Sequence, residues 1–346
     1  MSFSSAMARR IRAAARLDPH RRKLLGAALG AGLVPGFVPG LVPSARAEWV
    51  PARPVRIIVP YGAGGGADLL ARRVAERAKE LLGQPVVVDN RPGGGTAIGA
   101  VAVQNSAPDG HTLLLATSTT LCVNPALQRQ LSYAPEKFVP VANLQLLPFM
   151  VNVAKDSPVR SMKDLRAYAI ERNNQLNYGT LGIGSSNHVL GGLLSQRAAP
   201  GLVPVHYTSG PQALVGLVRG DIHIYFDGIS TSVPRVRQGE LRGIAVTSRE
   251  RVPAVPEIPT VYEEGFPEVG LSVWYGLVAP AGTPADAVTR LNAVFNQILQ
   301  MPDIVDAMVG EGTRPIPLTP SAFADLIRED TVVWRRAIED LKIKIE

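Results

Sequence analysis

Cysteine is almost absent from the chain, since Cys122 is the only one among 346 residues. A single cysteine excludes an intramolecular disulfide and a metal cluster built from cysteines. Its apolar neighbours in LCVNP favour a buried thiol over a catalytic nucleophile. The five histidines also lack the H-x-x-x-H and H-E-x-x-H spacings of metalloenzymes, so we expect no metal site.

Most of the chain has equal numbers of basic and acidic residues, although the formal net charge of the whole chain is +7. The first 47 residues hold eight of the 36 basic residues and one of the 29 acidic residues, so the remainder is neutral. Nucleic-acid binding depends on many cationic contacts with phosphates. The neutral remainder therefore predicts that the protein has no nucleic-acid partner.

The basic first segment, residues 1–47, has the three parts of a cleavable export signal. A basic stretch ends in HRRKLLG, an apolar stretch reads LLGAALGAGLVPGFVPGLVP, and the small-residue site ARA precedes position 48. Cleavage there would release a mature chain beginning at Glu48 into the periplasm. The arginine pair at positions 21 and 22 resembles a twin-arginine signal, with an ordinary export signal as the alternative. Prolines and glycines interrupt the apolar stretch, which disfavours a retained membrane helix.

Strand-like and helix-like segments alternate through the rest of the chain. In a first series, VRIIVPY, PVVVDN and HTLLLAT have the composition of buried strands, and helical patterns at residues 68–82 and 95–105 separate them. A second series, LNYGT, VPVHYT and DIHIYFD, follows the same rhythm. Such alternation is typical of an α/β fold with mostly parallel strands. Two series predict two lobes with a ligand cleft between them.

Glycine is concentrated at the first strand end, in VPYGAGGGADLLAR at residues 59–72. Gly62, Gly64 and Ala67 fit the G-x-G-x-x-A frame of dinucleotide-binding loops, and Asp89 closes the next strand, where such proteins bind ribose. An exported Rossmann-type dinucleotide-binding oxidoreductase is therefore one candidate function. A second glycine-rich turn, NRPGGG, begins directly after Asp89 and is not part of that motif.

Cationic side chains are missing from four polar strand ends, YGAGGG, TSTT, GTLGIGSSNH and YTSG. These loops supply hydroxyls and backbone N–H groups, and N–H groups at helix starts bind anions with the help of the helix dipole. In α/β sheets the ligand lies outside the carboxyl ends of the strands. The loops together predict a binding site for a small carboxylate that needs no cofactor.

A hydrolase is a second enzymatic alternative. Its triad would combine Ser185 or Ser186 with His188 or His206 and with Asp227. No G-x-S-x-G elbow surrounds either serine, which disfavours this interpretation. We therefore expect a binding protein and not an enzyme.

Seven motifs, in this order along the chain, resemble those of one family. They read YGAGGGADLLAR, VVVDNRPGGGTAIGA, APDGHTLLLATSTTLCVNPAL, LNYGTLGIGSSNHVLGGLL, HYTSGPQALVGLVRGDIHIYFDGIS, GIAVTSRERVPAVPEIPTVYEEGFP and WYGLVAPAGTP. Together they resemble the Bug (TctC-type) extracytoplasmic solute-binding proteins of tripartite tricarboxylate transporters, from about residue 54 to the C-terminal helix.

The resemblance implies a type II periplasmic-binding-protein fold, an α/β architecture of two lobes joined by crossover strands. Lobe 1 would comprise residues 48–148 and 271–346, and lobe 2 residues 149–270. The implied ligand is a small organic anion, and the implied partners are membrane transporter subunits. We expect the protein itself to be a monomer.

The ligand contacts that the resemblance implies lie on loops from both lobes. By position they are Tyr61, Gly64, Gly65, Gly66, Asp68, Thr117, Ser118, Thr119, Gly184, Ser185, Ser186, His188, Tyr207 and Asp227. Several positions depart from the family's pattern: Gly62-Ala63 replace Pro-Pro, Ala67 replaces Thr, Thr208-Ser209 replace Lys-Gly, Gly228 replaces Asn, and Ile183 stands where Asn is frequent. These departures make the expected pocket less polar, so we expect a monocarboxylate or an aromatic acid in preference to a tricarboxylate. Asp227 would accept a hydrogen bond from an amino or hydroxyl group of that ligand.

Overall fold

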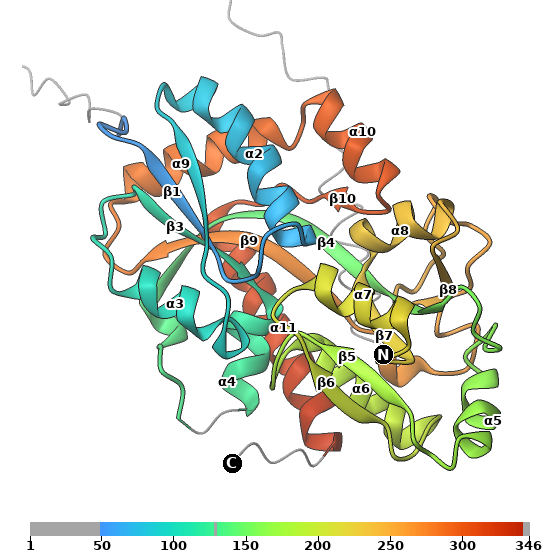
Figure 1. Ribbon diagram of the computed structural model, residues 1–346. Coiled ribbons are helices and arrows are strands. Elements are labelled where there is room, and N and C mark those ends of the chain that lie inside the picture. Colours follow the sequence, from blue (N-terminus) through green and yellow to red (C-terminus); the bar gives the residue numbers. More distant parts are fainter. Residues whose placement is uncertain (1–48, 128–129, 342–346) are drawn as a thin grey trace, which may run out of the picture. The chain divides into compact units, whose positions relative to one another are not determined.

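The computed structural model describes residues 49–127 and 130–341 (Figure 1). The predicted export signal at residues 1–47 lies outside this described part. Ten strands of the described part form one mixed sheet in the order β2-β1-β3-β9-β4-β7-β5-β6, with β8 and β10 paired to β4. The strands are β1 (Val55–Val59), β2 (Val86–Asn90), β3 (Thr112–Thr117), β4 (Phe138–Ala154), β5 (Asn177–Thr180), β6 (Val203–His206), β7 (Ile224–Gly228), β8 (Leu241–Val246), β9 (Ser272–Pro280) and β10 (Arg314–Pro315).

The first half of the sheet consists of β2, β1, β3 and β9. The first three strands are parallel, and β9 runs antiparallel to β3. Helices α2 (Gly66–Leu82) and α9 (Ala285–Ile298) share one hydrophobic core with these strands, and α3 (Ala97–Gln104) packs against β1 and β3. Strands covered by helices in this way are apolar along their length, as the sequence predicted.

Helix α2 begins at Gly66, two residues earlier than its apolar pattern predicted. Gly65 is the extended residue before it, and Gly83 ends it in the left-handed region with φ of 68°. The predicted stripe is buried at Leu70, Val74 and Ala78. The earlier start places the first backbone N–H groups of α2 directly in the glycine loop.

Strand β4 continues from the first half of the sheet into the second. Its residues 138–148 pair with β9, and residues 149–154 pair with β7 and β8, antiparallel in each case. The second half contains β5, β6 and β7 in parallel, with β8 beside β4. The sheet therefore passes from one half to the other through β4.

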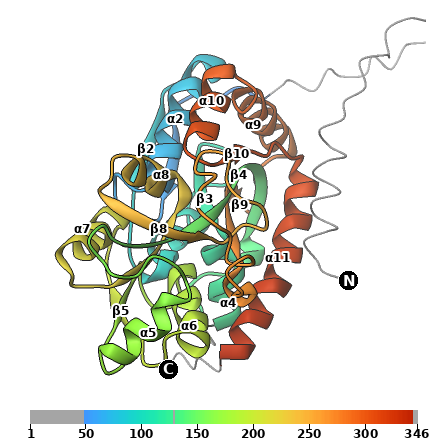
Figure 2. The same ribbon diagram turned by 90° about the vertical axis from the view of Figure 1, so that its right-hand side faces the viewer.

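The helices of the second half follow its strands in turn. They are α6 (Ser186–Arg197) after β5, α7 (Gly210–Arg219) after β6 and α8 (Ile229–Arg237) after β7. The last helix, α11 (Pro320–Leu341), packs against β4, against α6 and against the turn at Thr119–Val123 (Figures 1 and 2). The remaining α-helices of the described part are α4 (Asn124–Leu127), α5 (Asp164–Glu171) and α10 (Pro302–Gly310).

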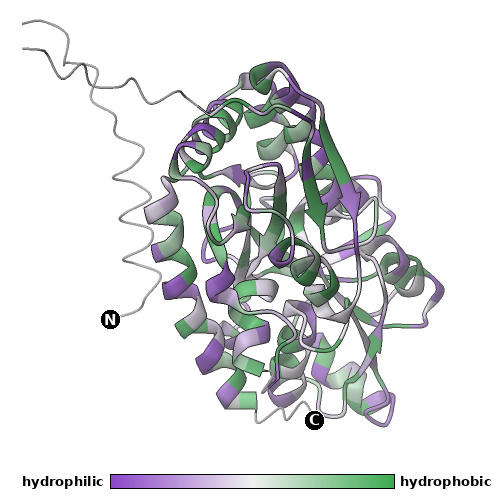
Figure 3. Ribbon diagram, turned by 90° about the vertical axis from the view of Figure 1, so that its left-hand side faces the viewer, coloured by the Kyte–Doolittle hydropathy of each residue, from purple (hydrophilic) through white to green (hydrophobic). Residues whose placement is uncertain are grey.

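Hydropathy follows this architecture. The strands are mostly hydrophobic, whereas the surface helices carry both hydrophilic and hydrophobic residues (Figure 3). None of the helices in the described part combines the length and the apolar character needed to span a membrane.

Candidate ligand-binding site

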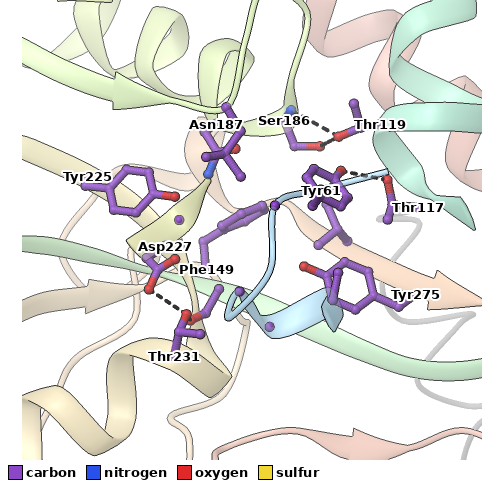
Figure 4. Close-up of a pocket in the computed structure, with 18 residues that line it drawn as sticks. Tyr61, Thr117, Thr119, Phe149, Ser186, Asn187, Tyr225, Asp227, Thr231 and Tyr275 are labelled. Atoms are coloured by element: carbon purple, nitrogen blue, oxygen red, sulfur yellow. Dashed lines mark hydrogen bonds between the residues drawn. The ribbon is translucent and has the colours of Figure 1, made fainter. Parts of the chain in front are cut away.

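A pocket lies where the two halves of the sheet meet (Figure 4). Its wall contains part of the predicted set, namely Tyr61, Gly65, Gly66, Thr117, Thr119, Ser186 and Asp227. It also contains residues that the sequence motifs did not single out as contacts: Gly62, Ala67, Phe149, Leu181, Asn187, Gly210, Tyr225, Gly228, Thr231, Val273 and Tyr275. Both halves of the sheet therefore contribute to one cavity.

Four helices, α2, α6, α7 and α8, place N-terminal residues in this wall. Ser185 and Ser209 cap α6 and α7 with their side chains, whereas Gly65 and Gly228 leave α2 and α8 without a side-chain cap. The first N–H groups of a helix have no partner within it, and its dipole is positive at that end. The wall thus favours an anion, although the part of the chain that the structure describes supplies no lysine or arginine to it.

Glycine is required in the first loop because the second half of the sheet approaches it closely. A Cβ at Gly62 would lie 2.8 Å from the Cβ of Ser209, and one at Gly66 would lie 2.8 Å from the Oγ of Ser230. A larger residue at either position would push the two halves apart.

Asp68 stabilises the glycine loop from behind, since it does not line the pocket. Its Oδ2 accepts hydrogen bonds from the backbone N–H of Gly64 at 2.9 Å and from the Nε of Arg72 at 3.0 Å. Burial opposes ionisation of this carboxyl, but the hydrogen bonds from Arg72 and Gly64 outweigh it and lower the pKa of Asp68. Gly64 and Asp68 were expected to contact the ligand directly. In the structure they form a hydrogen bond with each other instead, and neither lines the pocket.

Hydroxyl groups connect the wall across the two halves. The Tyr61 hydroxyl lies 3.1 Å from the Oγ1 of Thr117. The Oγ1 of Thr119 lies 2.8 Å from the Oγ of Ser186 and also accepts the backbone N–H of Ser186 at 3.3 Å (Figure 4). Thr119 follows β3 and Ser186 begins α6, so this pair joins the first half to the second at the pocket.

Aromatic side chains form the less polar part of the wall. Tyr225 comes from β7, Phe149 from β4 and Tyr275 from β9 (Figure 4). The side chain of Tyr225 is fully buried, and its hydroxyl has no hydrogen-bond partner among the described residues. Burial and the neighbouring Asp227 raise the pKa of Tyr225, so the hydroxyl stays neutral and can donate a hydrogen bond.

Asp227 is the one charged side chain among the described residues of the wall. It is 5% exposed, and its Oδ2 accepts hydrogen bonds from the hydroxyls of Thr231 at 2.6 Å and Ser232 at 3.1 Å. Burial raises the pKa of Asp227 to about 6, although these hydrogen bonds act in the opposite direction. The carboxyl is therefore ionised in neutral solution but close to taking up a proton.

The other predicted residues lie outside the pocket wall. The Oγ of Ser118 accepts the backbone N–H of Trp274 at 3.2 Å, and Ser185 caps α6. The backbone N–H of Gly184 donates to the Nδ1 of His188 at 3.2 Å, and the His188 ring stacks on Tyr178. Tyr207 packs against the hydrophobic cluster of α7. These residues shape the loops around the pocket in this conformation.

The hydrolase triad is not assembled in the described structure. The Oδ2 of Asp227 binds the hydroxyls of Thr231 and Ser232, and the Oγ of Ser186 binds Thr119. The Nδ1 of His206, at the end of β6, lies 2.6 Å from the hydroxyl of Thr180, at the end of β5. Ser186, His206 and Asp227 thus form hydrogen bonds with other residues and not with one another.

The residues that the motifs missed fall into two groups. Asn187, Gly210 and Thr231 lie at the starts of helices that follow predicted strands, so a search of first helical turns could have found them. Phe149 and Tyr275 lie inside β4 and β9, where the sequence shows only apolar strands. No sequence signal separates these two from residues of the core.

Comparison with known proteins places the chain in a family. Residues 70–343 match the family model described as "Tripartite tricarboxylate transporter family receptor". The chain belongs to this family. It is 32% identical over 302 residues to Protein BugT of Bordetella pertussis (strain Tohama I), covering 87% of this chain and 93% of BugT. The family expected from the motifs is therefore confirmed.

Solved structures agree with the fold. MatC (Rpa3494) from Rhodopseudomonas palustris with bound malate superimposes with a TM-score of 0.80 at 31% identity, covering 83% of this chain and 99% of that one. R. palustris Rpa4515 with adipate gives a TM-score of 0.81 at 31% identity, covering 85% and 99%. The α/β fold of periplasmic binding proteins, expected from the sequence, is confirmed.

Proposed function

We propose that this receptor binds a small carboxylate in the pocket between its sheet halves and delivers it to the membrane subunits of a tripartite transporter. The observation that carries the proposal is the convergence of the α2, α6, α7 and α8 N-termini on a pocket whose described lining residues include no cationic side chain. Backbone N–H groups and helix dipoles are sufficient to hold one carboxylate in such a place.

Two related proteins support the chemical class of the ligand. MatC has malate bound and Rpa4515 has adipate, and both are dicarboxylates. Family membership likewise favours a binding protein over the exported Rossmann-type oxidoreductase. We accordingly assign no catalytic role to the pocket.

Binding would bring together two lobes, residues 48–148 with 271–346 and residues 149–270. Contacts such as Thr119 with Ser186 form only when these lobes meet, so the ligand would select the closed arrangement. The protein would act as a monomer in the periplasm after removal of residues 1–47, with the twin-arginine route as the proposed path of export.

Specificity within the carboxylates would depend on Asp227 and on the apolar wall around it. A second carboxylate beside an ionised Asp227 is repelled by roughly 4 kcal/mol at 4 Å and an effective dielectric of about 20. An amino group, a hydroxyl group or a protonated acid is accepted instead. We propose monocarboxylates, including aromatic acids, ahead of tricarboxylates.

A thermal-melting panel tests the function. The mature protein would be heated with malate, adipate, benzoate, citrate, glutamate and NAD in turn. A ligand at about 100 times its dissociation constant adds roughly 2.7 kcal/mol to the free energy of unfolding. We expect a shift with at least one of the carboxylates and none with NAD. A shift with NAD alone would contradict the proposal.

A further inference from the structure

The pocket contains the negative charge of Asp227, and none of its described lining residues carries a positive charge that neutralises it. Asp227 is the one side chain of the described wall that is charged in neutral solution, while the α2 and α8 N-termini supply partial positive charge only. A bound carboxylate is therefore a second negative charge in the same buried cavity. Two carboxylates that share such a site do not both stay ionised at low cost.

The two oxygens of Asp227 have different surroundings. Both hydrogen bonds from Thr231 and Ser232 end on Oδ2. A Cβ built at Gly210 would lie 3.8 Å from Oδ1 and 3.6 Å from the hydroxyl of Tyr225, so these two atoms border the same part of the pocket. Tyr225 and Asp227 are two apart on β7 and point to the same side of the strand (Figure 4). Oδ1 is thus the oxygen that can carry a proton and present it to a ligand.

No neighbouring element compensates the charge fully. From β4 the residues paired with this end of β7 are Phe149 and Met150, which are apolar. The other titratable side chains of the described wall, from β7, β9 and the first loop, are Tyr225, Tyr275 and Tyr61, and burial raises the pKa of each. Arg235 of α8 lowers the pKa of Asp227, but it is partly exposed and pairs with Glu240 at 2.8 Å. The effect of burial on the pKa of Asp227 exceeds the opposing effects of the hydrogen bonds and Arg235. With a pKa of about 6, the carboxyl can take up a proton when an anion enters the pocket.

We propose that the protein takes up one proton from solvent each time a carboxylate enters this pocket, and that the proton resides on Oδ1 of Asp227. The ionised ligand, the ionised Asp227 and one proton then combine into a complex whose net charge is that of the free ligand: one negative charge for a monocarboxylate and two for a dicarboxylate such as adipate or malate. The proton on Oδ1 donates a hydrogen bond to the ligand, and Oδ2 keeps the bonds from Thr231 and Ser232. This inference rests on the proposed function, because it assumes that the pocket binds carboxylates.

Titration calorimetry with adipate and with malate measures the proton directly. At pH 7.5 in phosphate, HEPES and Tris, the observed heat should vary with the ionisation enthalpy of the buffer with a slope near one proton per ligand. Both acids are fully ionised in solution at that pH, so the proton comes from the buffer. Between pH 7 and pH 8 the dissociation constant should rise about tenfold, and below the pKa of Asp227 the dependence should flatten.

Two variants locate the proton. Asp227→Asn should abolish the uptake and the pH dependence of binding. Thr231→Val removes a hydrogen bond that favours the ionised form, so Asp227 should protonate before binding and the uptake at pH 7 should fall. Asp330→Asn is the matched control, since burial also raises the pKa of Asp330 to about 6, but this carboxyl bonds to the Nε1 of Trp274 and does not line the pocket. It should leave the uptake unchanged.

The outcomes separate this inference from the function on which it rests. Binding of adipate or malate without proton uptake overturns the inference and leaves the function standing. Uptake that persists in folded Asp227→Asn overturns the location of the proton, and with it the inference. If neither acid binds the parent protein between pH 6 and pH 8, the inference is contradicted for both acids, while the proposed function is decided separately by the other carboxylates of the melting panel.

Discussion

At the scale of single residues, the pocket contains polar groups that the folded chain itself leaves poorly satisfied. Tyr225 is fully buried, yet its hydroxyl has no hydrogen-bond partner among the described residues. A buried hydroxyl without a partner costs about 1–3 kcal/mol. Such a cost is expected where a ligand supplies the missing partner.

Tyr225→Phe separates binding from stability. Removing the hydroxyl should leave the free energy of unfolding of the empty protein unchanged or raise it by about 1 kcal/mol, and should weaken carboxylate binding about tenfold. Tyr178→Phe is the control, because the Tyr178 hydroxyl donates to the backbone oxygen of His188 at 3.2 Å outside the pocket wall. That variant should lose stability and keep its affinity. Unchanged affinity in Tyr225→Phe would show that its hydroxyl does not bind the ligand.

Asp227→Asn tests the assigned specificity. The amide removes the negative charge and keeps the shape, so dicarboxylates at pH 8 should bind about tenfold more tightly, while ligands with an amino group should bind more weakly. The test is to measure the dissociation constants of adipate and of glutamate for the parent protein and for Asp227→Asn. If both stay as in the parent protein, Asp227 serves only the turn into α8.

At the scale of elements, the sequence predicted the strands and the loops at helix starts better than it predicted which side chains face the pocket. The glycine loop, TSTT and GIGSSN are predictable because helix starts need glycines, hydroxyls and caps, and these residue types are visible in the sequence. The predicted contacts Ser118 and Tyr207 lie outside the pocket wall, because one residue along a loop turns a side chain to the opposite side. The aromatic contacts Phe149 and Tyr275 were not predictable, since pairing of β4 with β9 depends on segments far apart in the chain.

The second glycine-rich turn provides a test of how the two halves meet. Gly94 and Gly95 both have φ of 57°, so alanine is strained equally at either position. A Cβ at Gly95 would lie 2.8 Å from the backbone oxygen of Ile183 in the second half, whereas a Cβ at Gly94 meets only Ala97 and Ile98 at the start of the following helix α3.

Gly95→Ala should therefore weaken carboxylate binding about tenfold more than Gly94→Ala, because it obstructs contact between the halves. Both variants should lose a similar amount of stability, about 1 kcal/mol or more. Calorimetric titration and thermal melting of the pair measure the two effects. Equal affinities would show that contact at Ile183 does not contribute to binding.

At the scale of the whole molecule, binding and lobe movement should be coupled. The pocket wall draws on both halves of the sheet, so a ligand that contacts both stabilises the arrangement in which they meet. Small-angle scattering of the mature protein, beginning at Glu48 and purified without detergent, should give a smaller radius of gyration with saturating carboxylate than without it. An unchanged radius at saturation would indicate a cleft that is already closed or a site on one lobe.

The central claim is that backbone N–H groups at a helix start hold the carboxylate, and Gly65 tests it most directly. Proline at this position removes the N–H, whereas alanine keeps it. A Cβ there meets only the backbone oxygen of Gly62 at 3.8 Å, and the φ of −82° suits both residues. Calorimetric titration of adipate and malate into the folded variants should show near-parental affinity for Gly65→Ala and a loss of tenfold or more for Gly65→Pro. Parental affinity in both would contradict the account.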